Sequence, residues 1–212
     1  MKKSLLVLVF ALSFNLSNAQ EVLLNDYSQN EIGKYDDSNK YEELYLSTYT
    51  EQYKGEVYNG LLIKGKKGYA SSKRPFFKIP INLISEFHIF LKNGRDKYNE
   101  WENIRKEAKI DNMDKTIDVF AHKLDMEGDD YGYFSGITDV SLEFRAAGGV
   151  SNMMLKVYLN KNYKSDLLTI SLMNSSEDWR DLALLRLIND LTIEKVQVEI
   201  GKLNKGQDLF KN

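Results

Sequence analysis

Hydrophobic residues alternate with polar ones over a long stretch of the chain, and this period of two limits what the chain can fold into. The alternation runs from Lys115 to Met173, and turn-forming residues interrupt it three times. Successive side chains of a β-strand point to opposite faces, so each alternating segment predicts a strand with one buried and one wet face. Strands joined by short turns pair as antiparallel neighbours. We therefore expect about four strands in 115–174, arranged as an antiparallel β-meander.

Segments with helical spacing lie on both sides of this region. Between 84 and 109 apolar side chains recur every three or four residues, which predicts a central helix. Asn93-Gly94 interrupts the pattern, so the segment is one helix, two helices or a hairpin. Helical spacing returns after Ser175, and 193–203 fits a helix or a strand because its apolar residues also alternate. The predicted fold class is α+β, with the meander packed against the central helix and C-terminal helices.

The N-terminus has the three parts of a secretory signal peptide. Lys2 and Lys3 precede an apolar run, and small residues at the end of 1–19 fit cleavage before Gln20. The apolar run is shorter than the roughly 20 residues of a membrane-spanning helix. We therefore expect an exported protein that is periplasmic or extracellular after cleavage at the Ala19-Gln20 bond.

The remaining chain, 20–212, is expected to form a single α+β domain because no Pro-, Gly- or Ser-rich linker divides it. Its first part, 20–80, is polar, and we expect an N-terminal loop and hairpin region there. The second part, 81–212, carries the helix–sheet–helix core. The sequence shows no internal repeat.

Composition excludes several classes of protein. The 212 residues include no cysteine, which rules out disulfide scaffolds, thiol enzymes and zinc-thiolate sites. The net charge is only −2, so we expect no nucleic-acid partner. No segment after the signal peptide is long and apolar enough to predict a membrane span in the mature chain. The expected partner is a protein, a peptide or a glycan.

Catalytic motifs are scarce in this sequence. Only two histidines, His88 and His122, are available as general bases, and neither a nucleophile elbow nor a zinc-protease or phosphate-loop motif occurs. The sequence therefore favours a protein without catalytic activity, although it leaves an enzyme open.

An acidic segment is the candidate metal site. Its ligands would be Asp125, Glu127, Asp129 and Asp130, with His122 three residues earlier. Carboxylates and a glycine turn suit Ca²⁺ or another divalent metal, but the spacing departs from an EF-hand and an acidic hairpin turn explains the same residues. We therefore predict no cofactor, with a divalent metal as the weaker alternative.

Two further groups of residues are candidate ligand-binding surfaces. One is the basic stretch from Lys64 to Lys78, which lacks compensating acids and contains Lys64, Lys66, Lys67, Lys73, Arg74 and Lys78. The other is a tyrosine row: Tyr41, Tyr45, Tyr49 and Tyr53. Residues four apart share one face in a helix and in a strand, and tyrosine rings with wet hydroxyls suit glycan or peptide recognition. Surface solvation and amphipathic packing are the simpler explanations of both groups.

The leading functional hypothesis is an exported, non-catalytic protein that binds a partner or a ligand. One alternative is an exported metal-dependent hydrolase centred on His122 and the carboxylates of 125–130. Another is an inhibitor or immunity-type partner of a second exported enzyme.

Overall fold

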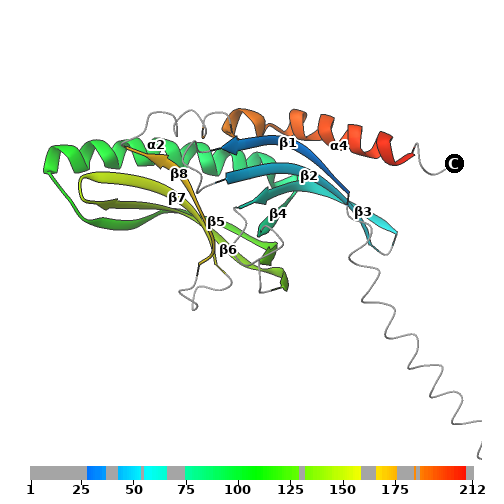
Figure 1. Cartoon of the computed structure of the whole chain (residues 1–212), viewed down its shortest axis with the longest axis horizontal. Helices are drawn as coiled ribbons and strands as arrows, with labels where there is room; N and C mark the ends of the chain where they lie inside the picture. Colours follow the sequence, from blue (N-terminus) through cyan, green and yellow to red (C-terminus); the bar gives the residue numbers. More distant parts are fainter. Residues whose placement is uncertain are drawn as a thin grey trace, which may run out of the picture.

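The chain folds into one antiparallel sheet with helices on one side of it. The computed structural model describes residues 28–36, 43–53, 55–65, 75–128, 132–158, 166–175, 184 and 187–208. Within these ranges eight strands form a single sheet, and their order in space is their order in the sequence (Figure 1).

The sheet has two successive halves of four strands each. The first half consists of β1 (Ser28–Asp36), β2 (Glu43–Tyr53), β3 (Glu56–Lys64) and β4 (Phe76–Pro80). The second half consists of β5 (Met113–Gly128), β6 (Gly132–Ala147), β7 (Val150–Tyr158) and β8 (Asp166–Asn174). Only two residue pairs join β4 to β5, so the ladder between the halves is short.

Helices follow each half. After β4 come a short 3₁₀ turn, η1 (Ile81–Leu83), and the long helix α2 (Ile84–Ala108). After β8, residues 187–190 are helical and α4 (Ile193–Asp208) ends the described chain. Each helix packs on the strands of the other half: α2 lies against β5, β6 and β7, and α4 lies against β1, β2 and β3. The topology therefore repeats, although no repeat is visible in the sequence.

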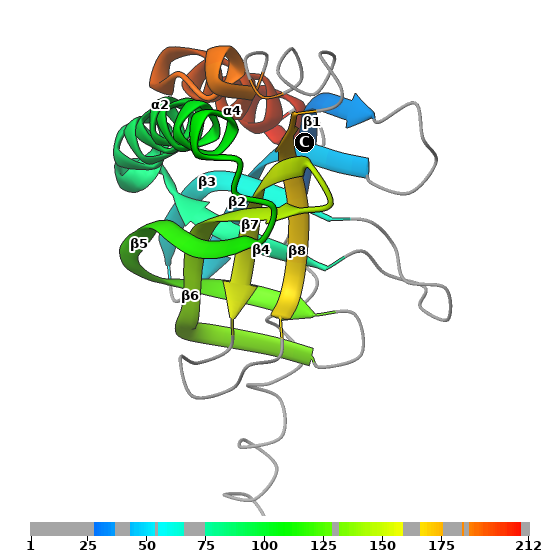
Figure 2. The same cartoon turned by 90° about the vertical axis from the view of Figure 1, so that its left-hand side faces the viewer.

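One face of the sheet forms the core with the helices. β7 alternates regularly between buried and half-buried residues, and Met153, Leu155 and Val157 on its buried side belong to the core. Side chains of α2 and α4, such as Phe87 and Val196, belong to the same apolar cluster. Both helices therefore lie on one side of the sheet, as seen in Figures 1 and 2.

The predicted α+β class, with an antiparallel sheet, a central helix and C-terminal helices, is confirmed. The four strands expected in 115–174 are β5 to β8. The N-terminal part, 20–80, was expected to hold loops and a hairpin, but it contributes four more strands to the same sheet. The residues of β1 have low strand propensity, and pairing with β2 supplies the backbone hydrogen bonds that propensity does not predict.

The glycine in the middle of α2 does not break the helix. Gly94 is buried, and a Cβ at this position would lie 2.2 Å from Leu142 Cδ1 on β6. The absence of a side chain lets the helix approach the sheet closely. The segment expected to be one helix, two helices or a hairpin is therefore a single helix that ends at Ala108. The segment 193–203, which fitted a helix or a strand, is helical. No helix in the described ranges has the length and apolar character needed to cross a membrane.

A buried ion pair fixes the C-terminal end of α2 to the sheet. Glu102 accepts hydrogen bonds from Arg105 Nε at 2.8 Å and from Arg105 Nη2 at 2.9 Å, and each side chain is 7% exposed. The same carboxylate accepts a hydrogen bond from the Ser151 hydroxyl at 2.5 Å. Arg105 also donates to the Gly149 carbonyl at 3.0 Å, so the pair ties the helix to β7 and to the β6–β7 turn.

The surroundings of Glu102 favour its ionised form. Burial alone would raise the pKa of Glu102, but hydrogen bonds from Arg105 and Ser151 and the charge of Arg105 outweigh it and lower the pKa to about 2. A carboxyl in an unfolded chain titrates near pH 4.3. The stabilisation from Glu102 is therefore complete above that pH and is lost as the pH falls towards 2.

We expect Glu102→Gln to reduce stability at neutral pH by about 3 kcal/mol, because it leaves Arg105 buried without its anion. The wild type should lose up to about 3 kcal/mol from this group between about pH 5 and about pH 2, and the variant should not. Urea unfolding at a series of pH values measures both effects. Glu107→Gln on the exposed side of α2 is the matched control. Parallel pH profiles of the wild type and Glu102→Gln would contradict this assignment.

Candidate functional site

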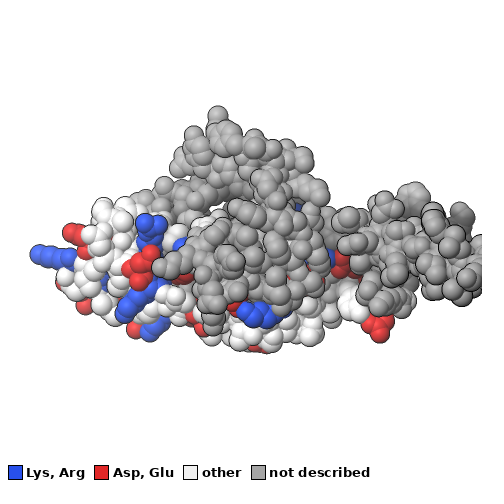
Figure 3. Space-filling view, turned by 90° about the horizontal axis from the view of Figure 1, so that it is seen from below, with Lys and Arg blue, Asp and Glu red and all other residues white. Residues whose placement is uncertain are grey.

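The side of the sheet turned away from the helices carries polar and charged residues, and we call it the polar face. Strand alternation places on it Ser47, Tyr49 and Glu51 of β2, Lys78 of β4, Asp125 of β5, Asp139, Ser141 and Glu143 of β6, and Lys156 and Tyr158 of β7. Neither of the described helices covers it. Figure 3 views this side and shows charges of both signs next to each other on its described part.

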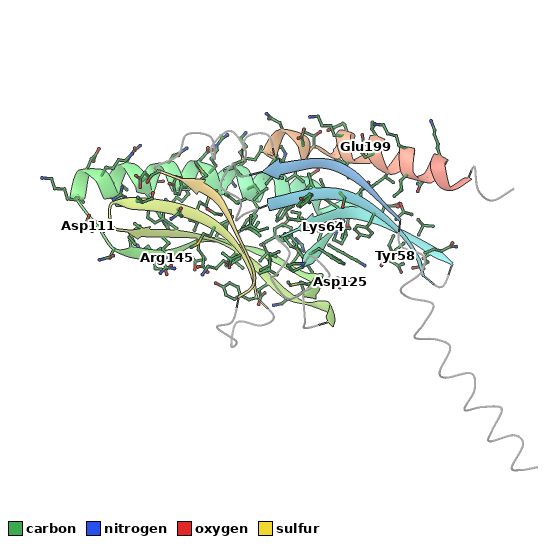
Figure 4. All side chains as sticks on the ribbon, viewed as in Figure 1. Tyr58, Lys64, Asp111, Asp125, Arg145 and Glu199 are labelled. Carbon is green, nitrogen blue, oxygen red and sulfur yellow. The ribbon has the colours of Figure 1, made fainter. Side chains whose placement is uncertain are left out.

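The first polar cluster surrounds Lys78, which is only 4% exposed. Its Nζ donates to Glu51 Oε1 at 2.5 Å and lies 5.3 Å from the centre of the Tyr49 ring. Strand register places Ser47 and Lys78 in one row across the sheet. Asp125 directly precedes Met126, the β5 partner of Phe77, and its charge acts on Tyr49. Lys78, Glu51, Tyr49, Ser47 and Asp125 form the Lys78 cluster; Figure 4 shows Asp125 on the side away from α2 and α4.

Gly60 of β3 provides the space that Tyr49 occupies. The two residues are register partners. A Cβ at Gly60 would lie 2.7 Å from Tyr49 Cε1 and 2.2 Å from the Ile79 carbonyl oxygen. The ring therefore lies across the backbone of β3, between its own strand and Lys78 on β4.

The Lys78 cluster contains a permanent hydrogen-bond donor and an unpaired hydroxyl. Burial, followed by the negative charges of Glu51 and Asp125, raises the pKa of Tyr49 well above its usual range, so its phenol stays protonated. Ser47 Oγ is buried and has no hydrogen-bond partner among the described residues. An unsatisfied buried hydroxyl costs about 1–3 kcal/mol, and a bound polar group would remove this cost.

A second polar cluster lies on β6 and β7 around Glu143. This carboxylate accepts hydrogen bonds from Lys156 Nζ at 2.9 Å, from the Tyr158 hydroxyl and from Ser141 Oγ at 3.4 Å. The side chains of Glu143 and Lys156 are 13% and 15% exposed. Asp139 lies next to them, opposite Tyr158 in the β6–β7 ladder. We call these five residues the Glu143 cluster.

Asp139 holds the second unpaired oxygen of the polar face. Its Oδ1 accepts a hydrogen bond from Lys123, whereas its Oδ2 is buried with no partner among the described residues. A carboxylate oxygen only accepts hydrogen bonds, so this atom needs a donor.

Some of the predicted ligand-binding residues lie on this face. Tyr45 and Lys64 are register partners and are both half-buried. They lie on the same face as Ser47, two residues further along the strands. Tyr49 is part of the Lys78 cluster, and Tyr53 is the last residue of β2. The other predicted residues, Tyr41, Lys66, Lys67, Lys73 and Arg74, lie outside the described residues.

The candidate metal ligands that are described do not lie together. His122 Nε2 lies 2.8 Å from Glu86 Oε1 of α2, and its ring packs against Phe120 on the helix side of the sheet. Asp125 lies on the polar face. Among the described residues there is no group of three or more His, Cys, Asp or Glu that could hold a metal ion. Glu127 belongs to β5, and Asp129 and Asp130 lie outside the described residues.

Sequence reasoning included Lys78 only in an exposed basic stretch and did not single out Glu143 or Lys156. Lys78 interrupts an apolar strand between Phe77 and Ile79, and a charge at such a position is a signal of a buried polar site. Glu143 and Lys156 occupy the polar positions of alternating strands, which predict a wet face rather than a half-buried cluster. No protein-family model, curated protein or solved structure matches the chain, so the candidate site rests on this geometry.

We expect Gly60→Ala to destabilise the protein by about 1–3 kcal/mol, because the new methyl group meets the Tyr49 ring and the Ile79 carbonyl. The carbonyl cannot move without opening the β3–β4 ladder. Urea unfolding measures the change. Gly201→Ala in α4 is the control: its Cβ would enter open space, and a better helix former should stabilise by about 1 kcal/mol. A stabilising Gly60→Ala would contradict the position of the Tyr49 ring.

Proposed function

We propose that the protein is an exported, non-catalytic binding protein that holds a polar, uncharged ligand on the polar face, with the Lys78 cluster at its centre. The observation that carries this proposal is the buried Lys78–Glu51 pair together with the unpaired Ser47 hydroxyl, which lies two strands from Lys78 in the same cross-strand row. These groups occupy a face that the described helices leave uncovered. The signal-like residues 1–19 support export.

Buried charges make this face unusual for a purely structural surface. Removing a lysine and a carboxylate from water costs several kcal/mol per ion, and an apolar pair of similar volume often stabilises a protein more. Buried charges that cost stability in this way tend to mark functional sites. Half-buried Glu51 and Asp125 border the buried Ser47, Tyr49 and Lys78, so the cluster has an accessible rim and a buried floor.

Charge pairing favours an uncharged ligand. Among the described residues, three ion pairs lie on the polar face: Lys78–Glu51, Lys123–Asp139 and Lys156–Glu143. Each lysine is balanced by a carboxylate, so the described pairs offer no net charge to an ionic ligand. They do offer many hydrogen-bond donors and acceptors.

The same contacts favour binding over nucleophilic catalysis. A serine nucleophile needs a general base within hydrogen-bond reach. Ser47 Oγ has no such partner among the described residues. The nearby Lys78 ammonium donates to Glu51 instead.

We expect neutral sugars or polyols to raise the melting temperature of the purified protein, with affinities measured by calorimetry. Ser47→Ala and Lys78→Met should each weaken binding by about tenfold or more, because a hydrogen bond to a buried group is worth about 1–3 kcal/mol. Ser85→Ala and Lys92→Met, at exposed positions of α2, are the matched controls. Unchanged affinity in folded Ser47→Ala and Lys78→Met would exclude the Lys78 cluster as the site.

Export has its own test. When the full chain is expressed in a bacterium, the protein should be recovered outside the cytoplasm with Gln20 as its first residue, as determined by mass spectrometry. A variant without residues 1–19 should stay in the cytoplasm. An uncleaved full-length chain in the cytoplasm would contradict the proposed export.

A further inference from the structure

The two halves of the sheet present polar residues of the same types, and one serine in each half occupies a corresponding position. The β2–β3 and β6–β7 hairpins both turn over two residues, after Tyr53 and after Ala147. Counting back six residues from these two positions gives Ser47 and Ser141, which therefore occupy the same place in the two halves. Both serines are buried on the polar face.

The two clusters have the same residue types. Each contains one Ser, one Tyr, one Glu, one Lys and one Asp. In each half the lysine lies in the cross-strand row of the serine: Lys78 with Ser47, and Lys156 with Ser141. Each lysine also donates to the glutamate of its own cluster, at 2.5 Å in the first half and at 2.9 Å in the second.

Each cluster also holds one buried oxygen that lacks a partner among the described residues. In the first half it is Ser47 Oγ, and in the second half it is Asp139 Oδ2. Two separate positions on one face therefore need a hydrogen-bonding group from elsewhere, and each belongs to a cluster that contains a Lys–Glu ion pair.

We infer that the polar face holds two related subsites, one in each half, and that its ligand is a neutral oligosaccharide chain long enough to reach both. This inference rests on the proposed binding function and specifies its ligand. β2 and β6 are four strands apart, which corresponds to roughly 19 Å along a flat sheet. A ligand that presents similar polar groups at both subsites must itself be repetitive.

A saccharide fits these subsites better than a peptide does. Sugar hydroxyls both donate and accept, so one kind of group can donate to Asp139 Oδ2 and can serve Ser47 Oγ in either direction. Extended peptides that bind sheets do so along an exposed edge, by main-chain pairing. The two subsites instead lie across the face of the sheet, where an added strand has no backbone partner.

The test is the dependence of affinity on chain length. Cello- and chito-oligosaccharides, from the monosaccharide to the octasaccharide, are titrated into the purified protein by calorimetry. We expect affinity to rise by about 10²-fold or more once the chain reaches both subsites, because the second contact becomes intramolecular. Lys78→Met and Lys156→Met should each reduce the affinity for the octasaccharide to about that of a short chain. Lys92→Met should change nothing.

Other results would overturn the inference in distinguishable ways. Equal affinity for short and long chains, or loss of binding only with variants of one cluster, would leave a single subsite and the proposed function intact. Binding of peptides or polyanions without any binding of saccharides would show that the ligand class is wrong. If none of these compounds binds, the inference and the proposed function both fail. Ser47→Ala and Ser141→Ala replace any lysine variant that melts well below the wild type.

Discussion

The packing of each helix on the opposite half of the sheet holds this fold together. Two residue pairs between β4 and β5 are too few to join two four-stranded sheets, so the apolar contacts of the helices must do so. Phe87 of α2 illustrates this, because it contacts both halves. The centre of its ring lies 6.1 Å from that of Phe77 in the first half and 5.2 Å from that of Phe120 in the second half. Each helix thus closes the core of the half that does not immediately precede it in the chain.

This exchange of helices commits one face of the sheet to the core and leaves the other face for polar groups. Alternation along each strand then separates the two roles residue by residue, as in β7, where Leu155 joins the core and Lys156 joins the Glu143 cluster. The buried polar residues are consequently not faults in the core. Those on the polar face form their own layer away from the helices, whereas Glu102, Arg105 and Ser151 are buried between α2 and β7.

The sequence predicted most reliably what depends on local periodicity. The alternation in 115–173 specified β5 to β8, and helical spacing specified α2. A composition rich in turn residues concealed β1, because its conformation comes from pairing with β2. Gly94 suggested a break, since sequence alone does not show that Leu142 lies against it.

Tyr45 and Tyr49 were predicted to share a face and do so, but the row that joins Ser47 to Lys78 depends on strand register. His122 and Asp125 are close in sequence and lie on opposite sides of the sheet.

The two unpaired oxygens differ chemically, and this difference has a consequence for a ligand that spans them. Ser47 Oγ can donate or accept a hydrogen bond, whereas Asp139 Oδ2 can only accept one. Glu143 already accepts three hydrogen bonds, so its cluster presents Asp139 as the atom that still needs a donor. The subsites are therefore related but not interchangeable. Because a saccharide chain has two different ends, we expect a chain that spans the two proposed subsites to bind in one preferred direction.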